Sequence, residues 1–314
     1  MKSILLIGGA GFIGSNIIRI LQIEESDYNI HVIEPTFANV SRIEGYNVTL
    51  HRGMLFDTDF IKQILTNHHI EVVVHLVSTL IPGSSYIDYE EEYKNVIFPS
   101  IRLMQLCCTL NIKFIYFSSG GTIYGNRSDT KPFKEDDPVL PISYYGWSKQ
   151  MMENSILFIH RTLGLKYLIL RPSNPYGFGQ NLYGNQGFIA VCIGKIIEGK
   201  NIEVWGSGHG LRDYIFIDDL CYIFKSLLEK DIIDKTFNIG SGLGCSNLDV
   251  LQIIEGVVEK KLNVTYLPAR NVDVSNMILD NSRVLSYIGK FEFVGLKNGI
   301  SYFYNSVMNK IKNG

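Results

Sequence analysis

The stretch Gly8-Gly9-Ala10-Gly11-Phe12-Ile13-Gly14 decides the fold of this 314-residue chain. An apolar run at 3–7 precedes it and apolar residues at helical spacing follow at 13–21, which predicts a strand, a tight turn and a helix. Gly8 allows the sharp turn, Gly11 lets the backbone approach a pyrophosphate, and Gly14 lets the helix pack close to the strand. The positive end of the helix dipole would then bind the pyrophosphate of a dinucleotide. The predicted cofactor contacts in this segment are Gly8, Gly11, Phe12, Ile13 and Gly14.

The next predicted strand, His31-Val32-Ile33-Glu34, ends in an acidic residue. In a dinucleotide-binding fold a carboxylate at this place accepts hydrogen bonds from the ribose hydroxyls of adenosine. The same carboxylate would repel a 2′-phosphate, so NAD is favoured over NADP. The alternative interpretation of Glu34 is a solvated strand end before Pro35.

The composition limits the possible classes of protein. The chain is 46% hydrophobic with a formal net charge of −2, so it can bury a large core as one big domain or as a large and a small one. No basic stripe indicates nucleic acid, no apolar run approaches the roughly 20 residues that span a bilayer, and the N-terminus has no signal-peptide pattern. We therefore expect a cytoplasmic protein that binds neither nucleic acid nor membrane.

The cysteines show neither metal-binding nor redox spacing, so we expect reduced core residues and no bound metal. They are Cys107, Cys108, Cys192, Cys221 and Cys245.

Strand-like and helix-like segments alternate along the first half of the chain. Short runs of β-branched or aromatic residues lie at 48–51, 71–75, 113–118 and 166–170, and the longest helical stretches lie at 88–110 and 145–163. This alternation predicts an α/β fold, a Rossmann-type doubly wound parallel sheet with helices on both faces.

After Arg171 the pattern is looser and rich in glycine, with later helices expected at 247–260, 281–288 and 297–311. This region predicts a smaller α/β C-terminal substrate lobe. We divide the chain into an NAD-binding Rossmann domain at 1–171, with a later return at about 208–240, and a remainder at 172–314 that is mainly this lobe.

The segment Tyr145-Gly146-Trp147-Ser148-Lys149 carries the candidate chemistry. Tyr145 and Lys149 stand four residues apart, so on a helix they share one face. The Lys149 ammonium can lower the pKa of the Tyr145 phenol and favour a phenolate near neutral pH. A tyrosinate beside a nicotinamide can take a hydroxyl proton while a hydride leaves the same carbon.

With these motifs the chain resembles, over essentially its whole length, the extended short-chain dehydrogenases/reductases. The branch is that of the NAD-dependent nucleotide-sugar epimerases and dehydratases, and the pattern is closest to UDP-glucose 4-epimerase. The further motifs that carry the resemblance are Phe117-Ser118-Ser119 through Tyr124-Gly125, Leu170 to Gly177, Gly206 to Asp219, Phe237 to Gly242 and Pro268 to Asp273.

The resemblance implies roles for residues outside the two opening motifs. The cofactor would also contact Leu55, whose backbone would serve where relatives place an Asp at Met54, and Leu76, Val77, Asn95 and Ser118. Two arginines would pair with the diphosphate of a nucleoside diphosphate sugar, since guanidinium groups suit phosphate oxygens. The implied substrate contacts are Thr122, Asn174, Gly187, Phe188, Trp205, Arg212, Arg270 and Asp273. Relatives usually form homodimers through the two long helices, and the resemblance implies the same here.

The segment Gly120-Gly121-Thr122 departs from the family pattern. Dehydratases carry acidic residues here, so elimination is not expected. Many epimerases carry Ser or Thr at the position of Gly120, so either Thr122 or Ser119 would have to bridge the sugar and Tyr145. Strand alternation favours Thr122 over Ser119.

The resemblance therefore implies a 4-epimerase that retains NAD. Tyr145 would remove the proton of the sugar 4-hydroxyl, Lys149 would tune Tyr145 and hold the nicotinamide ribose, and a transient 4-keto sugar would turn before hydride returns. Tyr145 and Lys149 are thus also predicted cofactor contacts. Two alternatives stay open. The first is an NAD(P)H-dependent 4-keto-sugar reductase of deoxysugar or surface-polysaccharide synthesis, and the second is a non-catalytic NAD-binding protein.

Overall fold

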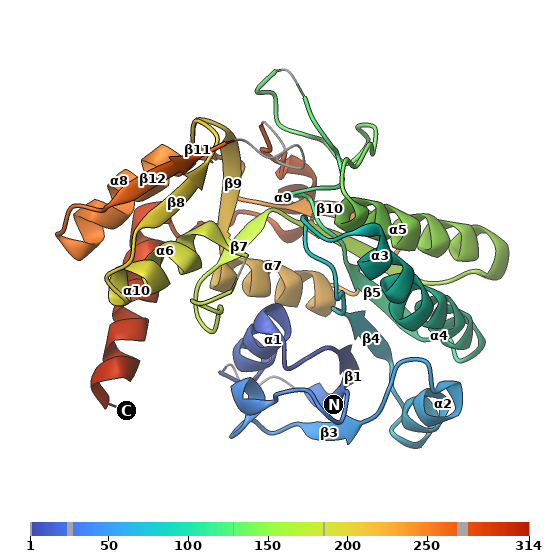
Figure 1. Cartoon of the computed structure of the whole chain (residues 1–314). Helices are drawn as coiled ribbons and strands as arrows, with labels where there is room; N and C mark the ends of the chain where they lie inside the picture. The colour runs from blue at the N-terminus through green and yellow to red at the C-terminus, as the bar shows by residue number, and fades with distance from the viewer. Residues whose placement is uncertain (1, 24–27, 128, 185, 269–275, 314) are drawn as a thin grey trace.

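A seven-stranded parallel sheet forms the centre of the larger domain (Figure 1). The computed structural model describes residues 2–23, 28–127, 129–184, 186–268 and 276–313. The strand order is β10-β6-β5-β4-β1-β2-β3, and all pairs run parallel. The strands are β1 (Lys2–Ile7), β2 (Tyr28–Glu34), β3 (Thr49–Arg52), β4 (Val72–His75), β5 (Lys113–Phe117), β6 (Tyr167–Pro172) and β10 (Lys235–Ile239). The order reverses between β1 and β4, and this is the point where a doubly wound sheet binds its ligand. The predicted Rossmann-type fold is confirmed.

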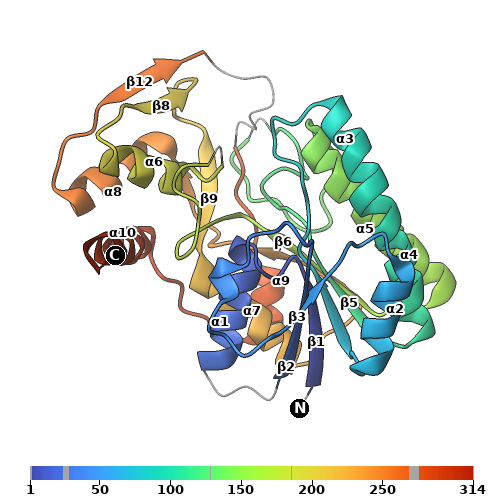
Figure 2. The ribbon, with the colours of Figure 1, turned by 60° about the horizontal axis from the view of Figure 1, so that its bottom comes forward.

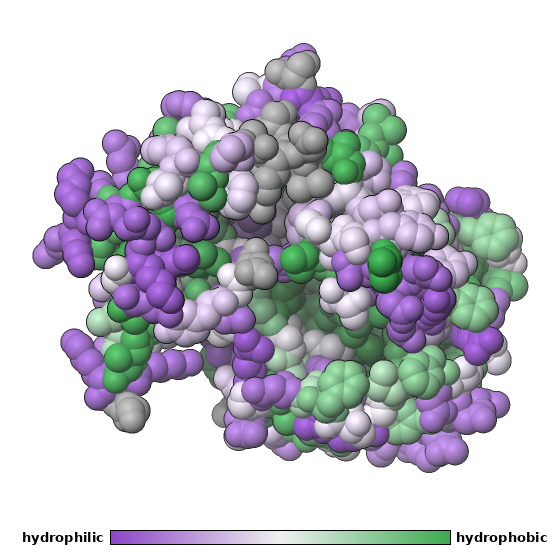
Figure 3. All heavy atoms as spheres, in the orientation of Figure 1, coloured by the Kyte–Doolittle hydropathy of each residue, from purple (hydrophilic) through white to green (hydrophobic). Residues whose placement is uncertain are grey.

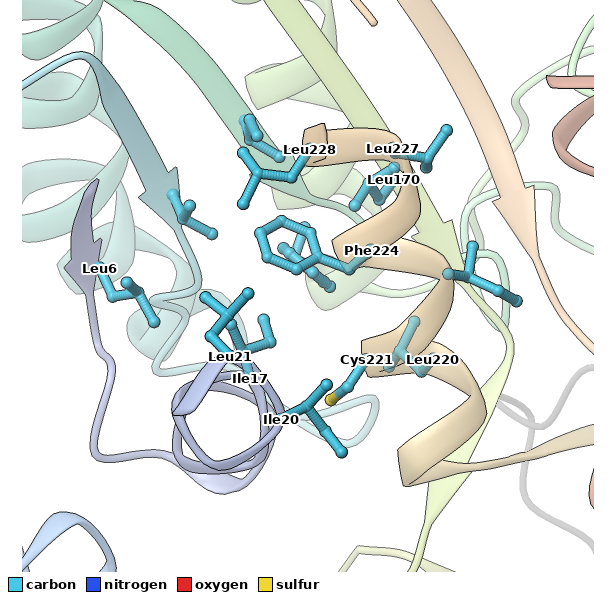
Figure 4. Packing of buried hydrophobic residues seen from close by; sticks show 14 of the residues in the cluster. Leu6, Ile17, Ile20, Leu21, Leu170, Leu220, Cys221, Phe224, Leu227 and Leu228 are labelled. Atoms are coloured by element: carbon cyan, nitrogen blue, oxygen red, sulfur yellow. The ribbon is translucent and has the colours of Figure 1, made fainter. Parts of the chain in front are cut away.

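Helices cover both faces of this sheet (Figure 2). One face packs against α1 (Phe12–Ile23), α7 (Ile217–Glu229) and α9 (Ser282–Ile288), and the other against α2 (Thr58–Asn67), α4 (Phe98–Thr109) and α5 (Tyr144–Leu163). On the first face Leu21 of α1 and Phe224 of α7 meet above Leu6 and Leu170 of the sheet (Figure 4). Because the central strands are buried on both sides, they need the continuous apolar sequences that the chain supplies.

The boundaries of α5 and the interruption of the helical stretch at 88–110 have clear local causes. Ser143 caps the start of α5 by accepting a hydrogen bond from the Gly146 N–H, and Gly164 ends it in the left-handed conformation. The single helix predicted at 88–110 is a succession of α3 (Tyr86–Glu92), a π-helical turn η2 (Tyr93–Ile97) and α4. A π-helical turn rotates the residues on either side relative to a regular helix, and such turns are frequent at functional sites.

The second lobe has its own core between two small sheets and three helices. One sheet has the order β11-β9-β7 and the other pairs β12 with β8. Their members are β7 (Asn174–Tyr176), β8 (Ile202–Trp205), β9 (Leu211–Phe216), β11 (Gly244–Ser246) and β12 (Val264–Leu267), with α6 (Phe188–Ile197), α8 (Asn247–Val258) and α10 (Leu296–Asn313). A short 3-10 helix, η1 (Ser41–Ile43), follows β2 in the first domain.

The chain crosses between the lobes more than once. Of the return predicted at about 208–240, α7 and β10 lie in the larger domain, whereas β9 pairs with β7 in the smaller lobe. The later helix α9 also packs on the larger domain. In the space-filling view the surface is hollowed between the two lobes (Figure 3).

All five cysteines are free thiols, as predicted, and three of them are buried. Burial raises the pKa of each thiol. None of the helices in the described part of the chain is long and apolar enough to cross a membrane.

Candidate active site

The glycine loop has the shape that its sequence predicts. Gly8 has a φ of +81°, and a Cβ there would lie 2.8 Å from Cγ2 of Val77. A Cβ on Gly14 would meet the Gly9 carbonyl oxygen at 2.6 Å, so the start of α1 packs directly on the turn. A Cβ on Gly11 would come near a single atom, the Gly8 carbonyl oxygen at 3.2 Å. The loop therefore presents bare backbone, beside the N–H groups of the first turn of α1, to a pyrophosphate.

Glu34 is buried at the end of β2 and tied to this loop. Its Oε1 accepts a hydrogen bond from the Ala10 N–H at 2.6 Å, and the residue is only 7% exposed. Burial raises the pKa of Glu34, and the Ala10 hydrogen bond and the charge of Arg52 lower it. The alternative of a solvated strand end is therefore wrong, and the carboxylate lies beside the glycine loop, as an adenosine ribose contact would require.

Tyr145 and Lys149 share one face of the first turns of α5, as their spacing predicts. The Lys149 ammonium is buried, donates a hydrogen bond to the Phe117 carbonyl at 3.1 Å, and lies 5.5 Å from the centre of the Tyr145 ring. Burial lowers the pKa of Lys149 to about 8, although the charges of Glu92 and Glu153 raise it. The side chain is thus held between a strand end and the tyrosine.

The expected lowering of the Tyr145 pKa by Lys149 is not what the structure shows. Burial raises the pKa of Tyr145, and a hydrogen bond with Ser119 is the contact that lowers it. Thr122 Oγ1 in turn donates to Ser119 Oγ at 3.2 Å. The preference for Thr122 over Ser119 is therefore not supported by these contacts. It assumed strand alternation through 118–120, whereas β5 ends at Phe117.

Gly120 stands where the family pattern often has Ser or Thr, and the structure leaves no room for such a side chain. A Cβ on this residue would lie 2.9 Å from the Arg171 carbonyl oxygen and 2.5 Å from Cδ1 of Leu279. The backbone oxygen cannot move aside without distorting β6. A side chain at this position has no room, and Ser119 contacts Tyr145 instead.

Glu92 is a buried acid beside the site that the sequence did not predict. It is 2% exposed, at the end of α3. Its carboxylate accepts hydrogen bonds from Ser78 Oγ at 2.9 Å and from the N–H and hydroxyl of Thr79 at 2.9 and 2.6 Å. Its charge raises the pKa values of both Lys149 and Tyr145. Glu92 therefore fixes the loop after β4 and places a negative charge near Tyr145 and Lys149.

Three buried polar atoms lie at the ends of adjacent strands without a hydrogen-bond partner in the described part of the chain. They are His75 Nδ1 in the last residue of β4, Ser118 Oγ just after β5, and Ser173 Oγ just after β6. Buried polar atoms are normally paired, so a ligand with its own donors and acceptors suits this edge. Together with the bare backbone at Gly11, they fit a bound dinucleotide along this edge of the sheet.

Of the remaining predicted cofactor contacts, some lie beside the glycine loop and one, Asn95, does not. Leu76 follows β4, and its N–H donates to the Ile7 carbonyl, which places 76 and 77 beside the glycine loop. Leu55 is half-buried in a turn after β3 and packs against the hydrophobic core between the sheet and helices α2, α4 and α5. Asn95 is exposed in the π-helical turn and donates to Glu91 at 3.2 Å. The structure does not bring Asn95 into contact with Tyr145 or Lys149.

Several predicted substrate contacts line the side of the smaller lobe. Asn174, in β7, donates to the Asp213 carbonyl at 2.7 Å, and its Oδ1 lies 3.5 Å from where a Cβ of Gly121 would be. Gly187 is the N-cap of α6 with a φ of +85°, and Phe188 is its half-buried first residue.

Two further predicted contacts lie on strands of this lobe. Trp205 ends β8 and is 41% exposed, while Arg212 is half-buried in β9, with Nη1 donating to the Leu211 carbonyl at 3.0 Å. Arg270 and Asp273 lie outside the described residues.

Asp213, next to Arg212, is a structural residue. It is fully buried and accepts hydrogen bonds from the Ser241 N–H and hydroxyl, the Gly242 N–H and the Leu279 N–H. Burial raises its pKa and these hydrogen bonds lower it. Asp213 thus joins β9 to the two loops that pass between the lobes.

Three features define a dinucleotide-dependent enzyme of the short-chain dehydrogenase type. They are the parallel doubly wound sheet, the glycine loop at its switch point, and the Tyr-x-x-x-Lys pair of α5 next to the end of β5. The chain matches the model of the NAD dependent epimerase/dehydratase family over residues 4–240 and belongs to that family. NAD is therefore its cofactor.

Individual relatives cover nearly the whole chain. A dTDP-4-dehydro-6-deoxyglucose reductase of Escherichia coli is 34% identical, over 98% of both chains. The crystal structure of UDP-glucose 4-epimerase from Thermotoga maritima with UDP-glucose superposes with a TM-score of 0.91 at 29% identity, covering 99% of this chain and 100% of the other. That of UDP-glucuronic acid 4-epimerase from Bacillus cereus, with UDP-glucuronic acid and NAD, has a TM-score of 0.88 at 25% identity, covering 98% and 100%.

Proposed function

We propose that this protein is an NAD-dependent epimerase that inverts carbon 4 of a nucleoside diphosphate sugar, with UDP-glucose/UDP-galactose or their N-acetyl counterparts as the first candidates. The observation that carries the proposal is the group formed by half-buried Tyr145 with buried Ser119 and Lys149, next to the end of β5. This group can remove a proton from a sugar hydroxyl and return it. The similarity to UDP-sugar 4-epimerases over almost the whole chain supports the same reaction.

Each residue of this group has its own role in the proposed reaction. Bound NAD supplies a carbon that accepts and returns a hydride. Tyr145 takes the proton of the 4-hydroxyl, and Ser119 stabilises the phenolate by hydrogen bonding, with Thr122 behind it. Lys149 adds positive charge beside the tyrosine while its link to Phe117 holds it in place. Protonated Tyr145 then returns the proton when the ketone is reduced from its other face.

Inversion requires the keto sugar to turn while its nucleotide stays bound. We propose that the smaller lobe binds the diphosphate, through Asn174, Arg212 and Arg270, with Trp205 at the base and Asp273 at a sugar hydroxyl. Gly187 and Phe188 would contribute the start of α6. Binding energy placed on the diphosphate leaves the hexose free to rotate, because the contacts of Arg212 and Arg270 with the phosphates do not touch the reacting ring.

A second function is favoured by a specific observation. The Escherichia coli relative at 34% identity is a reductase, and the UDP-glucose 4-epimerase structure is 29% identical. A 4-keto-sugar reductase would use the same residues, with Tyr145 as the acid that protonates the forming alkoxide. It would need exchangeable reduced cofactor, and it would require no rotation of the sugar. The intact Tyr145 and Lys149 argue against a non-catalytic NAD-binding protein.

One experiment separates these functions. Purified protein, with no cofactor added, is incubated with UDP-glucose, UDP-galactose, UDP-GlcNAc and UDP-GalNAc in turn, and the anomeric protons are followed by NMR. Interconversion of a pair supports the 4-epimerase and names its sugar. If none of the four substrates is interconverted, and NADH or NADPH is oxidised when dTDP-4-dehydro-6-deoxyglucose is added, the epimerase proposal is overturned in favour of the reductase.

We also propose that the protein is a cytoplasmic homodimer that pairs through α4 and α5. Large apolar side chains are exposed on these helices, among them Phe98 at 44%, Phe158 at 59% and Leu163 at 54%. An antiparallel four-helix contact would bury them. Light scattering after gel filtration tests the proposal: Phe158→Glu should shift the mass from two chains to one, and a wild-type monomer at micromolar concentration would refute it.

A further inference from the structure

Three histidines from separate segments gather on the sheet face that α2 covers. His31 lies in β2, His51 in β3, and His68 is the C-cap of α2. In the parallel pairing of β2 with β3, His51 stands opposite Ile33. Since Ile33 and His31 are two residues apart on one strand, their side chains lie on the same face. The fold therefore brings His31 and His51 together on the face where α2 ends.

The imidazole nitrogens of this triad are close enough to share one ligand. One ring nitrogen from each histidine lies within 4.8 Å of the others. His31 Nδ1 and His51 Nε2 are 3.0 Å apart, and the centres of the three rings lie 4.5 to 5.3 Å from one another. Among the described residues this is the one group of three or more His, Cys, Asp or Glu with such geometry.

The spacing suits a transition metal ion. With metal–nitrogen bonds of about 2.0–2.1 Å, two nitrogens of a tetrahedral site are roughly 3.3 Å apart. The His31–His51 pair is already near that separation. His68 would have to move in by about 1.5 Å at most, and it is half-buried at a helix end where its side chain can rotate.

The residues around the three histidines include one that can orient the His31 ring, and they leave a path by which an ion can reach the ring nitrogens. The amide nitrogen Nδ2 of Asn29 lies 3.0 Å from Nε2 of His31, the ring nitrogen that does not face His51. With the amide turned by 180°, its oxygen would take this place, accept the Nε2–H and leave the Nδ1 lone pair for a metal, as outer partners of metal-binding histidines usually do. His31 is 1% exposed, whereas His51 and His68 are half-buried, so an ion can enter beside these two.

We propose that His31, His51 and His68 form a binding site for a divalent transition metal ion of the zinc type, with water as the fourth ligand. Three imidazoles and no carboxylate or thiolate favour Zn²⁺, Ni²⁺ or Cu²⁺ over Mg²⁺ or Ca²⁺. The site differs from that of Tyr145, which lies on α5 beside β5. It joins the edge strand β3 and its neighbour β2 to the end of α2, and the bound ion crosslinks β2, which ends in Glu34, to these two elements.

The competing arrangement is a metal-free hydrogen-bond chain. Asn29 can donate to Nε2 of His31, and the His31 Nδ1–H can then donate to Nε2 of His51. Both arrangements fit the positions of the His31 and His51 rings, but they differ in which His31 nitrogen carries the proton, in the orientation of the Asn29 amide and in the approach of His68. Direct metal binding distinguishes them.

The test uses the full chain without an affinity tag, stripped with a chelator and dialysed. Zn²⁺ is titrated by calorimetry, Co²⁺ is followed by its visible absorption, and the thermal midpoint is measured with and without Zn²⁺. Two variants remove ligands, His51→Gln and His68→Ala, and His69→Asn is the matched control. His69 is exposed next to His68 with a φ of 49°, a conformation that Asn tolerates.

We expect one Zn²⁺ per chain, and a rise in the thermal midpoint that grows with the Zn²⁺ concentration. Loss of an outer partner alone weakens metal sites by about 10–100-fold, so each ligand variant should weaken binding by at least that much, while His69→Asn binds as the wild type does. If His51→Gln does not fold, the Zn²⁺ affinity of His68→Ala alone decides the test. The proposal is overturned if Zn²⁺ does not bind, or binds equally well to His68→Ala.

Discussion

The carboxylate of Glu92 raises the pKa of Lys149, and it does so from the last residue of α3. Burial of Lys149 has the larger, opposite effect and brings this pKa to about 8. Glu153, one helical turn beyond Lys149 on α5, acts in the same direction as Glu92. The ammonium that the proposed chemistry requires is therefore present at neutral pH because two buried acids oppose the desolvation of the lysine.

Replacement of Glu92 should make catalysis more sensitive to alkali. In Glu92→Gln the pKa of Lys149 falls further below its ordinary value, since the negative charge is gone. A charged Lys149 is lost as the pH rises through its pKa, so the alkaline limb of the kcat profile should move to lower pH. We expect kcat at pH 8 to fall roughly two- to fivefold more than at pH 6.5.

The neighbouring acid provides the control. Glu91 is exposed and pairs with Lys94 at 3.5 Å, away from Thr79 and Ser78. Glu91→Gln should leave the pH profile of kcat unchanged. An equal loss of kcat at every pH in Glu92→Gln would mean that Glu92 only holds the loop after β4 and does not tune the lysine.

Tyr145→Phe should remove turnover without removing binding. The substitution deletes only the hydroxyl that transfers the proton, so kcat should fall by about 10²–10⁴-fold or more, with NAD and nucleotide-sugar affinities kept within several-fold. Tyr144→Phe is the matched control, because Tyr144 packs on Tyr89 with ring centres 5.7 Å apart and makes that contact through its ring. Calorimetry and initial rates provide the two measurements. Loss of binding in Tyr145→Phe would contradict the assigned role.

The contacts of Ser119 and Thr122 predict different consequences for the two hydroxyls. Ser119 hydrogen-bonds to Tyr145 and lowers its pKa, and Thr122 reaches Tyr145 only through Ser119. Ser119→Ala should therefore move the limb of the pH profile that titrates Tyr145 to higher pH. Its kcat should fall by roughly three- to tenfold, the usual value of one hydrogen bond. Thr122→Val should cost less and leave that limb in place, and a larger effect of Thr122→Val would restore the original preference for this residue.

The fold could be predicted because its signals are local. The glycine loop, the apolar strands and the alternation with helices each depend on neighbouring residues, and they correctly give the parallel sheet with helices on both faces. The smaller lobe offers no such signal. Its β8 pairs with β12 across about sixty intervening residues, and neither strand is apolar throughout, so only the packed structure decides the pairing.

The site was predictable where a helix fixes the spacing and not where burial decides. Tyr145 and Lys149 share a face by helical geometry alone. Glu92 lies in the run Glu90-Glu91-Glu92, which has the pattern of a solvated helix face, and only the third member is buried. Its inward direction depends on the packing of α3 against α5 and on the π-helical turn that follows, neither of which the sequence pattern indicates.

A buried ion pair beneath the site should be necessary for stability. Arg171 Nη2 and Nε donate to Glu153 at 2.6 and 3.0 Å, and Nη1 donates to the Tyr124 hydroxyl at 2.8 Å. Arg171→Ala leaves Glu153 buried without its partner, so we expect a loss of about 3–5 kcal/mol in the free energy of unfolding. Lys2→Ala, which breaks a more exposed pair with Asp231, should cost about 1 kcal/mol or less. Urea unfolding measures both, and equal losses would contradict the importance of the buried pair.

The last prediction concerns the missing hydroxyl at Gly120. If this glycine were a neutral departure from the family pattern, Gly120→Ser would place a hydroxyl beside Tyr145 and would be tolerated. The structure predicts the opposite, because a Cβ would lie 2.9 Å from the Arg171 carbonyl oxygen and closer still to Leu279. We expect Gly120→Ser to destabilise the protein by about 1–3 kcal/mol in urea unfolding, the usual cost of overpacking, and to lower kcat as well. The adjacent Gly121→Ala is the control, since its Cβ would come no nearer than 3.5 Å to Asn174 Oδ1 and the free energy of unfolding should hardly change. A stable Gly120→Ser with unchanged or faster turnover would show that the loop can rearrange, and that Ser119 is not the only hydroxyl that can serve Tyr145.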